Sequence, residues 1–479
     1  MEFNSPQYFL FLGLVLVLYY AGARTYRAQR LLIVGASLVF YAAWSPTFLL
    51  HFVAVATLNY AASLWMLATP SQRGRRLILG FAIAVDLVNL AVFKYSTLLV
   101  DSLLGLSGRL FGRSDFMTVP HLILPLAISF YTFHIISYLV DVYQQKPGAR
   151  AASLLDFLFY VTLFPHQIAG PILRGHELFH QMRHQPPRAA NLLQGFERVL
   201  LGLFQKAVIA DNLAVIADYG FKHHAALSAG ELYVVLIAYT FQIFCDFAGY
   251  SNMAIGSARM LGYVLPENFN NPYVVANISE FWRRWHMTLS RWIRDYIFIP
   301  LGGSQGSAWA TSINLLITMG LAGLWHGASW TFLVWGLYHG AGLVVARAYA
   351  ATGLRQRLMQ GLSQPLYRLL AIVVTFHFVM LGWVLFRARD FTTAWDIYRQ
   401  LAAGLTTLDA WYVAPAFLLK SYGFTALVLY GVYVLLARWH FSRQILQDGL
   451  RRGYLYAIVL YLVLLLAPVH TNPFIYFQF

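Results

Sequence analysis

Residues 277–303 read NISEFWRRWHMTLSRWIRDYIFIPLGG, and residues 320–340 read GLAGLWHGASWTFLVWGLYHG. The first stretch is dense in charge, whereas no Asp, Glu, Lys or Arg occurs between Asp295 and Arg347. The chain thus joins a charged segment to a long apolar segment that carries two histidines. The fold has to place the charged segment outside the lipid and the apolar segment within it, so these two segments constrain the fold class.

The charged stretch has the pattern of an amphipathic helix. Asn277, followed three positions later by Glu280, is typical of a helix start and predicts one helix from Ile278 to Tyr296. Six formal charges between Ser279 and Tyr296 exclude a lipid-facing span, so we expect this helix at the membrane interface or tucked into the protein beneath it. At 100° per residue, His286 lies at the edge of an aromatic side that faces away from a charged side. The aromatic side comprises Trp282, Trp285, Leu289, Trp292, Ile293 and Tyr296, and the charged side comprises Arg283, Arg284, Arg291, Arg294 and Asp295.

The apolar stretch is too long for a single membrane crossing. Residues 308–346 number 39, which is roughly 58 Å as a continuous helix against a hydrocarbon core of about 30 Å. We therefore expect a break that places His326 at a helix interruption, where irregular backbone must line a cavity or be buried in protein. Candidate break points are Gly320, Gly323, Gly327 and Ser329, and the spacings Gly323 to Gly327 and Gly336 to Gly340 predict close helix packing.

The composition indicates a helical membrane protein. Of the 479 residues, 59% are hydrophobic and only 11% are charged, which excludes a soluble globular protein. The apolar runs are about 15 to 25 residues long, too continuous for an outer-membrane barrel. We predict an all-α, polytopic fold with roughly eleven to thirteen membrane segments, some of them re-entrant. These segments are expected to form one domain over residues 1–479, with a catalytic core near 120–350. The apolar runs lie near 8–22, 31–44, 47–68, 77–100, 119–140, 154–172, 192–217, 231–256, 308–325, 329–347, 366–386, 424–438 and 454–470.

Basic loops predict the orientation of the chain. Arginines follow the first and third apolar runs, and Lys146 and Arg150 follow the fifth, so these loops are expected in the cytoplasm and the amino terminus outside. Residues 8–23 superficially resemble a signal peptide, but the missing basic start and the many later spans favour an uncleaved first helix. The single cysteine, Cys245, excludes an intramolecular disulfide. The net charge of +15 suits anionic lipids or a phosphate-bearing substrate.

Polar residues inside apolar runs are candidate functional residues. Gln242 and Asp246 lie four apart on one face of a predicted helix, and an intramembrane carboxylate is costly unless it faces a cavity or a partner. Both a cavity-lining role and a structural hydrogen bond between helices remain open for Asp246. His166, in the turn-rich sequence FPHQIAGP, is more often structural, and so is His339.

Several motifs together resemble the membrane-bound O-acyltransferase family, in particular its bacterial alginate O-acetylation branch. EFWRRWHMTLS and GLWHG form the most specific pair, and one departure is Asn252, where relatives often carry a carboxylate. The matching pieces are SFYTFHIISYLVDVY at 129–143, LFPHQIAGPILR at 163–174, QIFCDFAGYSNMAIGSARMLG at 242–262, PENFNNPY at 266–273, EFWRRWHMTLSRWIRDYIFIPLGG at 280–303, GLWHGASWTFLVWGLYHG at 323–340 and the terminal PFIYFQF.

The resemblance implies acyl transfer from a thioester donor, usually acetyl-CoA, to a hydroxyl acceptor or to a partner that passes the group on. The family's essential histidine corresponds to His326 here, and His286 to a second polar position. A hydroxyl needs a base as it attacks the thioester, and histidine suits that task. We expect His326 to be the base, in surroundings without formal charge that favour its neutral form.

The remaining candidates concern binding. Arg283, Arg284 and Arg291 are expected to bind coenzyme A phosphates, with lipid headgroups as the alternative, because guanidinium groups match phosphate oxygens. Trp325 is a candidate for the cofactor platform, although tryptophans also serve as interface anchors. No bound cofactor, no metal site and no nucleic-acid partner is expected.

We therefore expect an inner-membrane O-acyltransferase whose helices enclose a tunnel, with cytoplasmic acetyl-CoA as donor and a periplasmic acetyltransferase or acceptor protein as partner. The expected end substrate is an exopolysaccharide, most of all alginate, with cellulose or peptidoglycan as alternatives. D-alanyl transfer to teichoic acid fits less well. A polysaccharide exporter with a relay of His and Asp residues is the rival from another class, and a structural scaffold is a third.

Overall fold

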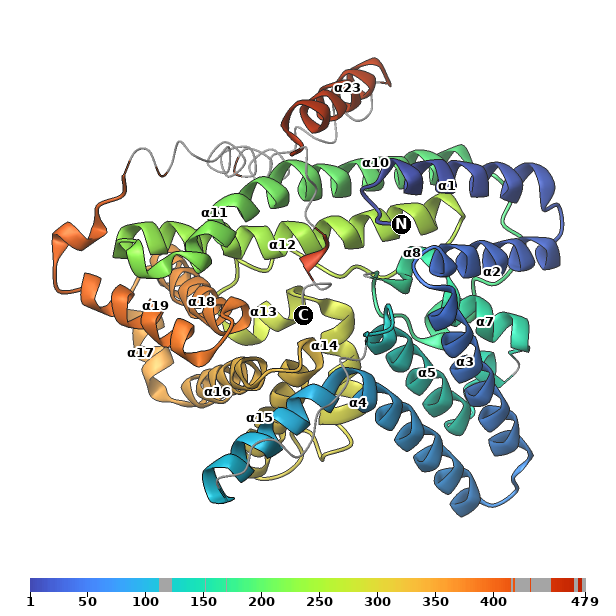
Figure 1. Cartoon of the computed structure of the whole chain (residues 1–479), viewed down its shortest axis with the longest axis horizontal. Helices are drawn as coiled ribbons and strands as arrows, with labels where there is room; N and C mark the ends of the chain where they lie inside the picture. The colour runs from blue at the N-terminus through green and yellow to red at the C-terminus, as the bar shows by residue number, and fades with distance from the viewer. Residues whose placement is uncertain are drawn as a thin grey trace. The chain divides into compact units, whose positions relative to one another are not determined.

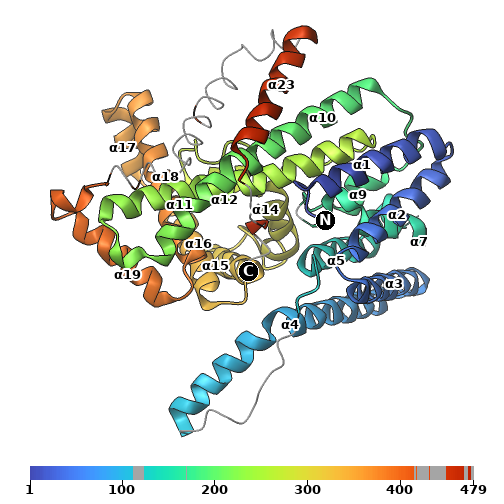
Figure 2. The ribbon, with the colours of Figure 1, turned by 45° about the horizontal axis from the view of Figure 1, so that its top comes forward.

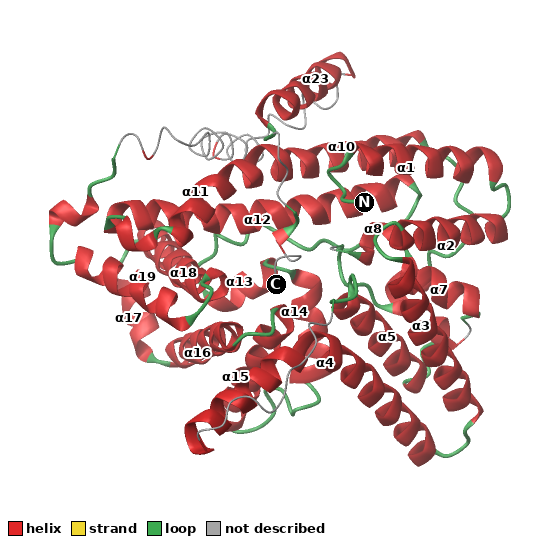
Figure 3. Ribbon diagram, in the orientation of Figure 1, coloured by secondary structure: helices red, strands yellow, loops and turns green. Residues whose placement is uncertain are grey.

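The computed structural model describes residues 1–111, 123–150, 152–168, 170–414, 417, 431, 449–468 and 473–475. Every regular element in these residues is a helix, and no strand occurs among them (Figure 3). The predicted all-α class is thus confirmed. Apart from residue 431, the expected apolar run at 424–438 lies outside the described residues, as do residues 476–479 of the terminal motif.

Among the described residues, six helical runs are long and apolar enough to cross a membrane, which confirms the polytopic class. Two shorter apolar runs, Pro6–Gly22 and Gly453–Leu466, accompany them. The predicted segment count and the tunnel stay predictions. The six long runs are Pro46–Ala68, Gln72–Leu104, Ala189–Lys222, Ala229–Met260, Ala308–His326 and Gln364–Arg387.

The chain divides into two compact units, and the first comprises residues 1–197 and 254–267. Its helices α3 and α4 pack side by side, and α5 contacts both (Figure 2). Residues far apart in sequence meet in its core, where the Tyr8 hydroxyl donates to Ser257 Oγ at 2.7 Å. The elements that begin here are α1 (Pro6–Val17), η1 (Leu18–Gly22), α2 (Tyr26–Ala42), α3 (Pro46–Ala68), α4 (Gln72–Phe111), α5 (Ile128–Tyr143), α6 (Pro147–Arg150), α7 (Leu154–Thr162), α8 (Phe164–Gln167), α9 (Gly175–Phe179) and α10 (Ala189–Leu203).

The second unit comprises residues 198–253 and 268–479 and holds both the charged stretch and the apolar stretch. Helices α10 and α12 contribute residues to both units. The elements of the second unit are η2 (Phe204–Ala210), α11 (Asp211–Lys222), η3 (His224–Ala226), α12 (Ala229–Met260), α13 (Ile278–Arg284), α14 (Met287–Ile293), η4 (Arg294–Phe298), α15 (Ala308–His326), α16 (Trp330–Ala351), α17 (Gly353–Gly361), α18 (Gln364–Arg387), α19 (Phe391–Gly404), η5 (Leu408–Trp411) and α23 (Gly449–Leu466).

The apolar stretch forms the helical hairpin α15–α16 (Figure 1). Helix α15 ends at His326, residues 327–329 make the turn, and the Ser329 side chain caps the start of α16. A Cβ atom added at Gly323 would lie 2.2 Å from the Phe332 carbonyl oxygen, so only glycine permits this approach. The predicted break beside His326 and the close helix packing are both confirmed.

Gly336 gives a direct test of this packing. In Gly336→Ala, the new Cβ would lie 2.2 Å from the Met319 carbonyl oxygen, which is backbone and cannot move aside. We expect overpacking to lower stability by about 1–3 kcal/mol, measured as a lower midpoint in a thermal unfolding series in detergent. Gly353→Ala is the matched control, because nothing lies within 4 Å of its added Cβ. Equal midpoints for the two variants would contradict the tight hairpin.

The predicted continuous helix over 278–296 is wrong. Its start is as expected, since Asn277 Oδ1 accepts from the Glu280 N–H at 2.8 Å, but α13 ends at Arg284. Trp285 is extended, His286 adopts a left-handed conformation with φ 42° and ψ 53°, and α14 begins anew at Met287. The local pattern of charged and aromatic residues could not reveal this break, because its cause lies elsewhere in the chain.

Candidate active site

Asn268, in the turn-rich segment before α13, holds the backbone break open. Its Oδ1 accepts from His286 Nδ1 at 3.1 Å and from Thr288 Oγ1 at 2.9 Å, and its Nδ2 donates to Ser251 Oγ at 3.1 Å. The Met287 N–H also donates to the Asn268 carbonyl at 2.9 Å. One buried side chain therefore ties α12, the break at His286 and α14 together, and it offsets the left-handed backbone at His286.

These contacts fix the chemistry of His286. Because Asn268 Oδ1 is acting as an acceptor, His286 carries its proton on Nδ1 and presents an unprotonated Nε2. That Nε2 has no hydrogen-bond partner among the described residues, and the side chain is fully buried. Burial lowers the pKa of His286 to about 3, so the ring is neutral at physiological pH. A buried, neutral imidazole with an open acceptor atom can bind a hydroxyl or take its proton.

Trp325 lies beside both histidines that the sequence singled out. Its ring centroid is 6.1 Å from that of His286 and 4.9 Å from that of His326. His326 is 3% exposed, at the last position of α15. Its ring also meets Trp335 and Phe386 edge-on, with centroids 5.1 and 5.3 Å away. The two short helices and the hairpin thus bring His286, Trp325 and His326 into one aromatic cluster.

His339 belongs to the same aromatic cluster but makes different contacts. Its ring lies 4.9 Å from that of Trp335 and 5.2 Å from that of Trp282. Neither ring nitrogen has a hydrogen-bond partner among the described residues, and the side chain is fully buried. The structural role that the sequence favoured for His339 stays a prediction.

Asp246 belongs to a buried ion cluster. Lys206 Nζ lies 2.8 Å from Asp211 Oδ1 and 2.6 Å from Asp246 Oδ1, and all three side chains are at most 4% exposed. Asp246 Oδ2 accepts from the Ile475 N–H at 2.8 Å, which joins the carboxy-terminal segment to α12. Of the two roles left open for Asp246, these contacts favour the structural one.

The carboxy-terminal segment connects this ion cluster to the histidines. Phe474 stacks on Tyr250, with centroids 4.4 Å apart, and lies 5.6 Å from Phe247. Phe247 in turn meets the His286 ring edge-on at 4.7 Å. Asp246 is thus linked to the aromatic cluster through these neighbours.

The other predicted binding residues are not gathered around Trp325 by any contact described. Gln242 is buried, and its Oε1 has no hydrogen-bond partner among the described residues. Arg283 is exposed, Arg284 pairs with Glu280 at 2.6 Å, and Arg291 is half-buried on α14. Their binding roles stay predictions.

Sequence reasoning missed three residues that organise the site or the ion cluster beside it. Asn268 was seen only as part of a turn-rich link, and no local signal marks its side chain as the partner of His286. Lys206 and Asp211 could have been found, because both interrupt an apolar run as Asp246 does.

Comparison with known proteins identifies the family. A family model described as MBOAT, membrane-bound O-acyltransferase family, matches residues 149–381, which include the backbone break and the hairpin. The chain is 44% identical to the probable alginate O-acetylase AlgI of Azotobacter vinelandii over 84% of this chain and 78% of the relative. The chain belongs to the membrane-bound O-acyltransferase family.

Two further relatives are similar to this O-acyltransferase over most or all of its length. The probable alginate O-acetylase AlgI of Pseudomonas putida is 36% identical over the whole of both chains. The peptidoglycan O-acetyltransferase of Helicobacter pylori is 36% identical over 83% of this chain and 79% of the relative. The resemblance on which the sequence analysis relied is confirmed, and so is the enzyme class.

Proposed function

We propose that this O-acyltransferase moves an acetyl group from cytoplasmic acetyl-CoA across the inner membrane for O-acetylation of an exopolysaccharide, most of all alginate. The observation that carries the proposal is the pair of buried histidines around Trp325, within the part of the chain that the family model matches. The alginate O-acetylases among its relatives support the choice of polymer.

The proposed chemistry needs a base in a dry environment. His326 takes the proton from the acceptor hydroxyl as its oxygen attacks the thioester carbonyl, the new C–O bond forms, and the C–S bond breaks. Coenzyme A leaves as the thiolate and receives a proton. His286 Nε2 is available to hold a hydroxyl or carbonyl-bound group in place, since Asn268 occupies the opposite ring nitrogen.

The binding and partner roles follow from the same proposal. Arg283, Arg284 and Arg291 bind the phosphates of coenzyme A, with Trp325 beside the acyl group. The amino terminus lies in the periplasm, where a separate acetyltransferase or acceptor protein receives the group. The basic loops of the sequence support this orientation.

Peptidoglycan is the second candidate acceptor. The Helicobacter pylori relative, named as a peptidoglycan O-acetyltransferase, covers nearly as much of this chain as the alginate O-acetylase of Azotobacter vinelandii does. The two acceptors would use the same donor chemistry and differ only in what is presented at the outer face.

Thiol release from acetyl-CoA tests the donor. We expect purified full-length protein in nanodiscs to release coenzyme A when alginate oligomers and the periplasmic partner are supplied, with release measured by a thiol reagent. The only cysteine, Cys245, is fully buried, so the protein itself adds little background. Peptidoglycan fragments serve as the second acceptor. If no acceptor elicits coenzyme A release while proteoliposomes still move glycan, the exporter takes the place of the proposed enzyme.

A further inference from the structure

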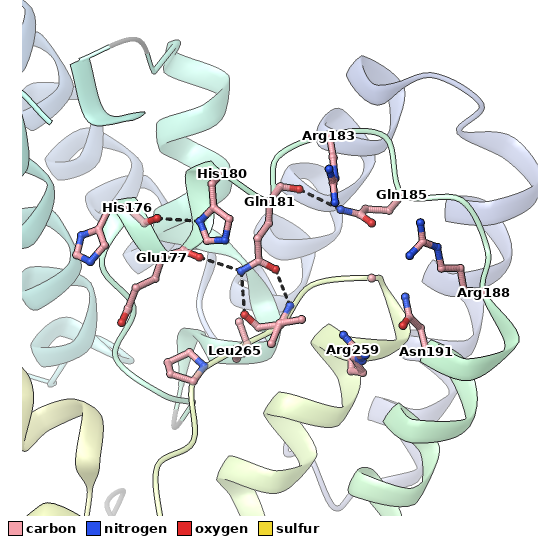
Figure 4. A pocket seen from close by; sticks show the side chains of 13 residues that line it. His176, Glu177, His180, Gln181, Arg183, Gln185, Arg188, Asn191, Arg259 and Leu265 are labelled. Atoms are coloured by element: carbon pink, nitrogen blue, oxygen red, sulfur yellow. Dashed lines mark hydrogen bonds between the residues drawn. The ribbon is translucent and has the colours of Figure 1, made fainter. Parts of the chain in front are cut away.

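A polar pocket of about 700 Å³ lies in the first unit, apart from the histidines described above. Its lining comes from α9, from residues 180–188 that follow it, from the start of α10 and from the end of α12 with residues 262–266 (Figure 4). This volume falls within the range of small-molecule binding pockets. All of the lining residues belong to one unit, so the pocket is a feature of that unit alone.

Three arginines in the pocket supply excess positive charge. Arg183, Arg188 and Arg259 line it, and in the view of Figure 4 they lie on the same side of Gln181 as Asn191. Arg183 and Arg188 have no carboxylate partner among the described residues, and Arg259 Nη2 donates to the neutral Gln194 Oε1 at 2.8 Å. Three guanidinium groups thus line the pocket, and none of them has an ion pair among the described residues.

One carboxylate, Glu177, also lines the pocket, on the side opposite the arginines in Figure 4. Its Oε2 accepts from the Arg174 N–H at 2.9 Å, as part of the start of α9. The carboxylate is therefore used by the local backbone, and the balance of the lining remains positive.

The amides in the wall are held in fixed positions. Gln181 Nε2 donates to the Val264 carbonyl at 3.0 Å, and its Oε1 accepts from the Val264 N–H at 2.8 Å. Gln185 is clamped through its backbone, which exchanges hydrogen bonds of 2.9 and 3.0 Å with the Gln29 side chain. Gly262 has φ +93°, and a Cβ there would lie 2.9 Å from Gln185 Oε1. The wall is thus built before any ligand arrives, which lowers the cost of binding.

The contact to Gln29 also relates the pocket to the predicted orientation of the chain in the membrane. Gln29 lies in the first turn of α2, immediately beside Arg24, Arg27 and Arg30, which form the first loop that the positive-inside rule assigns to the cytoplasm. The pocket wall is therefore hydrogen-bonded to the helix that carries Arg27 and Arg30. On the predicted cytoplasmic side, soluble phosphate compounds and the headgroups of anionic lipids are both within reach.

We infer that this pocket binds a phosphate-bearing anion through Arg183, Arg188 and Arg259. Guanidinium groups match phosphate oxygens in geometry and charge, and the neutral amide wall adds no negative charge that would oppose an anion. The ligand is either a soluble phosphate compound or the phosphodiester headgroup of an anionic lipid. The inference does not rest on the proposed acyl transfer, since none of these arginines belongs to the histidine cluster.

Two probes distinguish a soluble phosphate ligand from a lipid headgroup. Both are tested on delipidated full-length protein in detergent. Adenosine 3′,5′-bisphosphate represents soluble phosphates and is measured by calorimetry at low salt. Dihexanoyl phosphatidylglycerol represents lipid headgroups and is compared with dihexanoyl phosphatidylcholine by native mass spectrometry. We expect at least one anionic probe to bind, with affinity that falls as salt is raised.

The variants assign that binding to the pocket. Arg183→Gln and Arg188→Gln should each weaken it about tenfold, equivalent to about 1.4 kcal/mol, and both side chains are exposed, so the variants should fold. Arg27→Gln is the matched control, since it removes the same charge from the same basic side outside the pocket and should leave binding unchanged. Loss of bisphosphate binding alone identifies a soluble ligand, and loss of phosphatidylglycerol binding alone identifies a lipid. Binding of neither probe, or equal weakening in Arg27→Gln, overturns the inference.

Discussion

His326→Ala is expected to lower the rate of coenzyme A release by about 10²–10⁴-fold, the usual contribution of a general base. The imidazole is 3% exposed at the end of α15, and in the proposed mechanism it is the group that accepts the hydroxyl proton. The measurement is the initial rate of thiol release with saturating acceptor. Size-exclusion profiles and thermal midpoints establish that the variant is folded.

His339 offers a control of nearly the same environment. Both histidines are buried, and each packs edge-on or tilted against Trp335, with centroids 5.1 and 4.9 Å away. His326→Phe and His339→Phe therefore make the same chemical change in the same aromatic cluster. We expect His326→Phe to be as inactive as His326→Ala, and His339→Phe to keep most of its activity. Equal loss in the two Phe variants would mean that the cluster needs both rings for packing, and the catalytic role of His326 would fall.

The helical class and the hairpin could be predicted from sequence because their causes are local. A run of 39 residues without formal charge cannot span about 30 Å of hydrocarbon as one helix. Glycines at 323 and 336 then mark where two helices can approach. The structure places the turn at residues 327–329, immediately after His326, as this argument requires.

The break at His286 could not be predicted because its cause is remote. The helical pattern runs through Trp285 and His286 without interruption, and a non-glycine residue with positive φ carries no sequence signal. The competing interaction comes from Asn268, eighteen positions earlier, whose side chain accepts from His286 and Thr288. Long-range hydrogen bonds of this kind override local propensity, and they do so here at the proposed active site.

The fate of Asp246 illustrates the same limit. The energetic cost of a carboxylate in an apolar segment correctly predicted that Asp246 has a partner. The sequence around Asp246 could not identify that partner as Lys206, which lies forty positions earlier. Nor could it reveal that the carboxylate also accepts from the Ile475 N–H. A buried charge predicts that a compensating charge or hydrogen bond exists, but the residue that supplies it depends on the tertiary fold.

Lys206→Met is expected to destabilise the protein by about 3–5 kcal/mol, because it removes the cation that two buried carboxylates share. Asp211 and Asp246 are 1% and 4% exposed at their side chains, so neither can recover its hydration without local unfolding. The expected readouts are a lower thermal midpoint in detergent and a lower yield of monodisperse protein. Activity should fall with the folded fraction.

Two further variants separate charge from packing. Asp246→Asn keeps the Lys206–Asp211 pair at 2.8 Å and an oxygen that can accept from Ile475, so its effect should be small. Lys206→Met combined with Asp211→Asn and Asp246→Asn removes every charge of the cluster, and it should regain most of the stability that Lys206→Met loses. If Lys206→Met were as stable as Asp246→Asn, the lysine would not be neutralising these carboxylates. If the triple variant were no better than Lys206→Met, the loss would come from the packing of the lysine stem in the π-helix η2 and not from uncompensated charge.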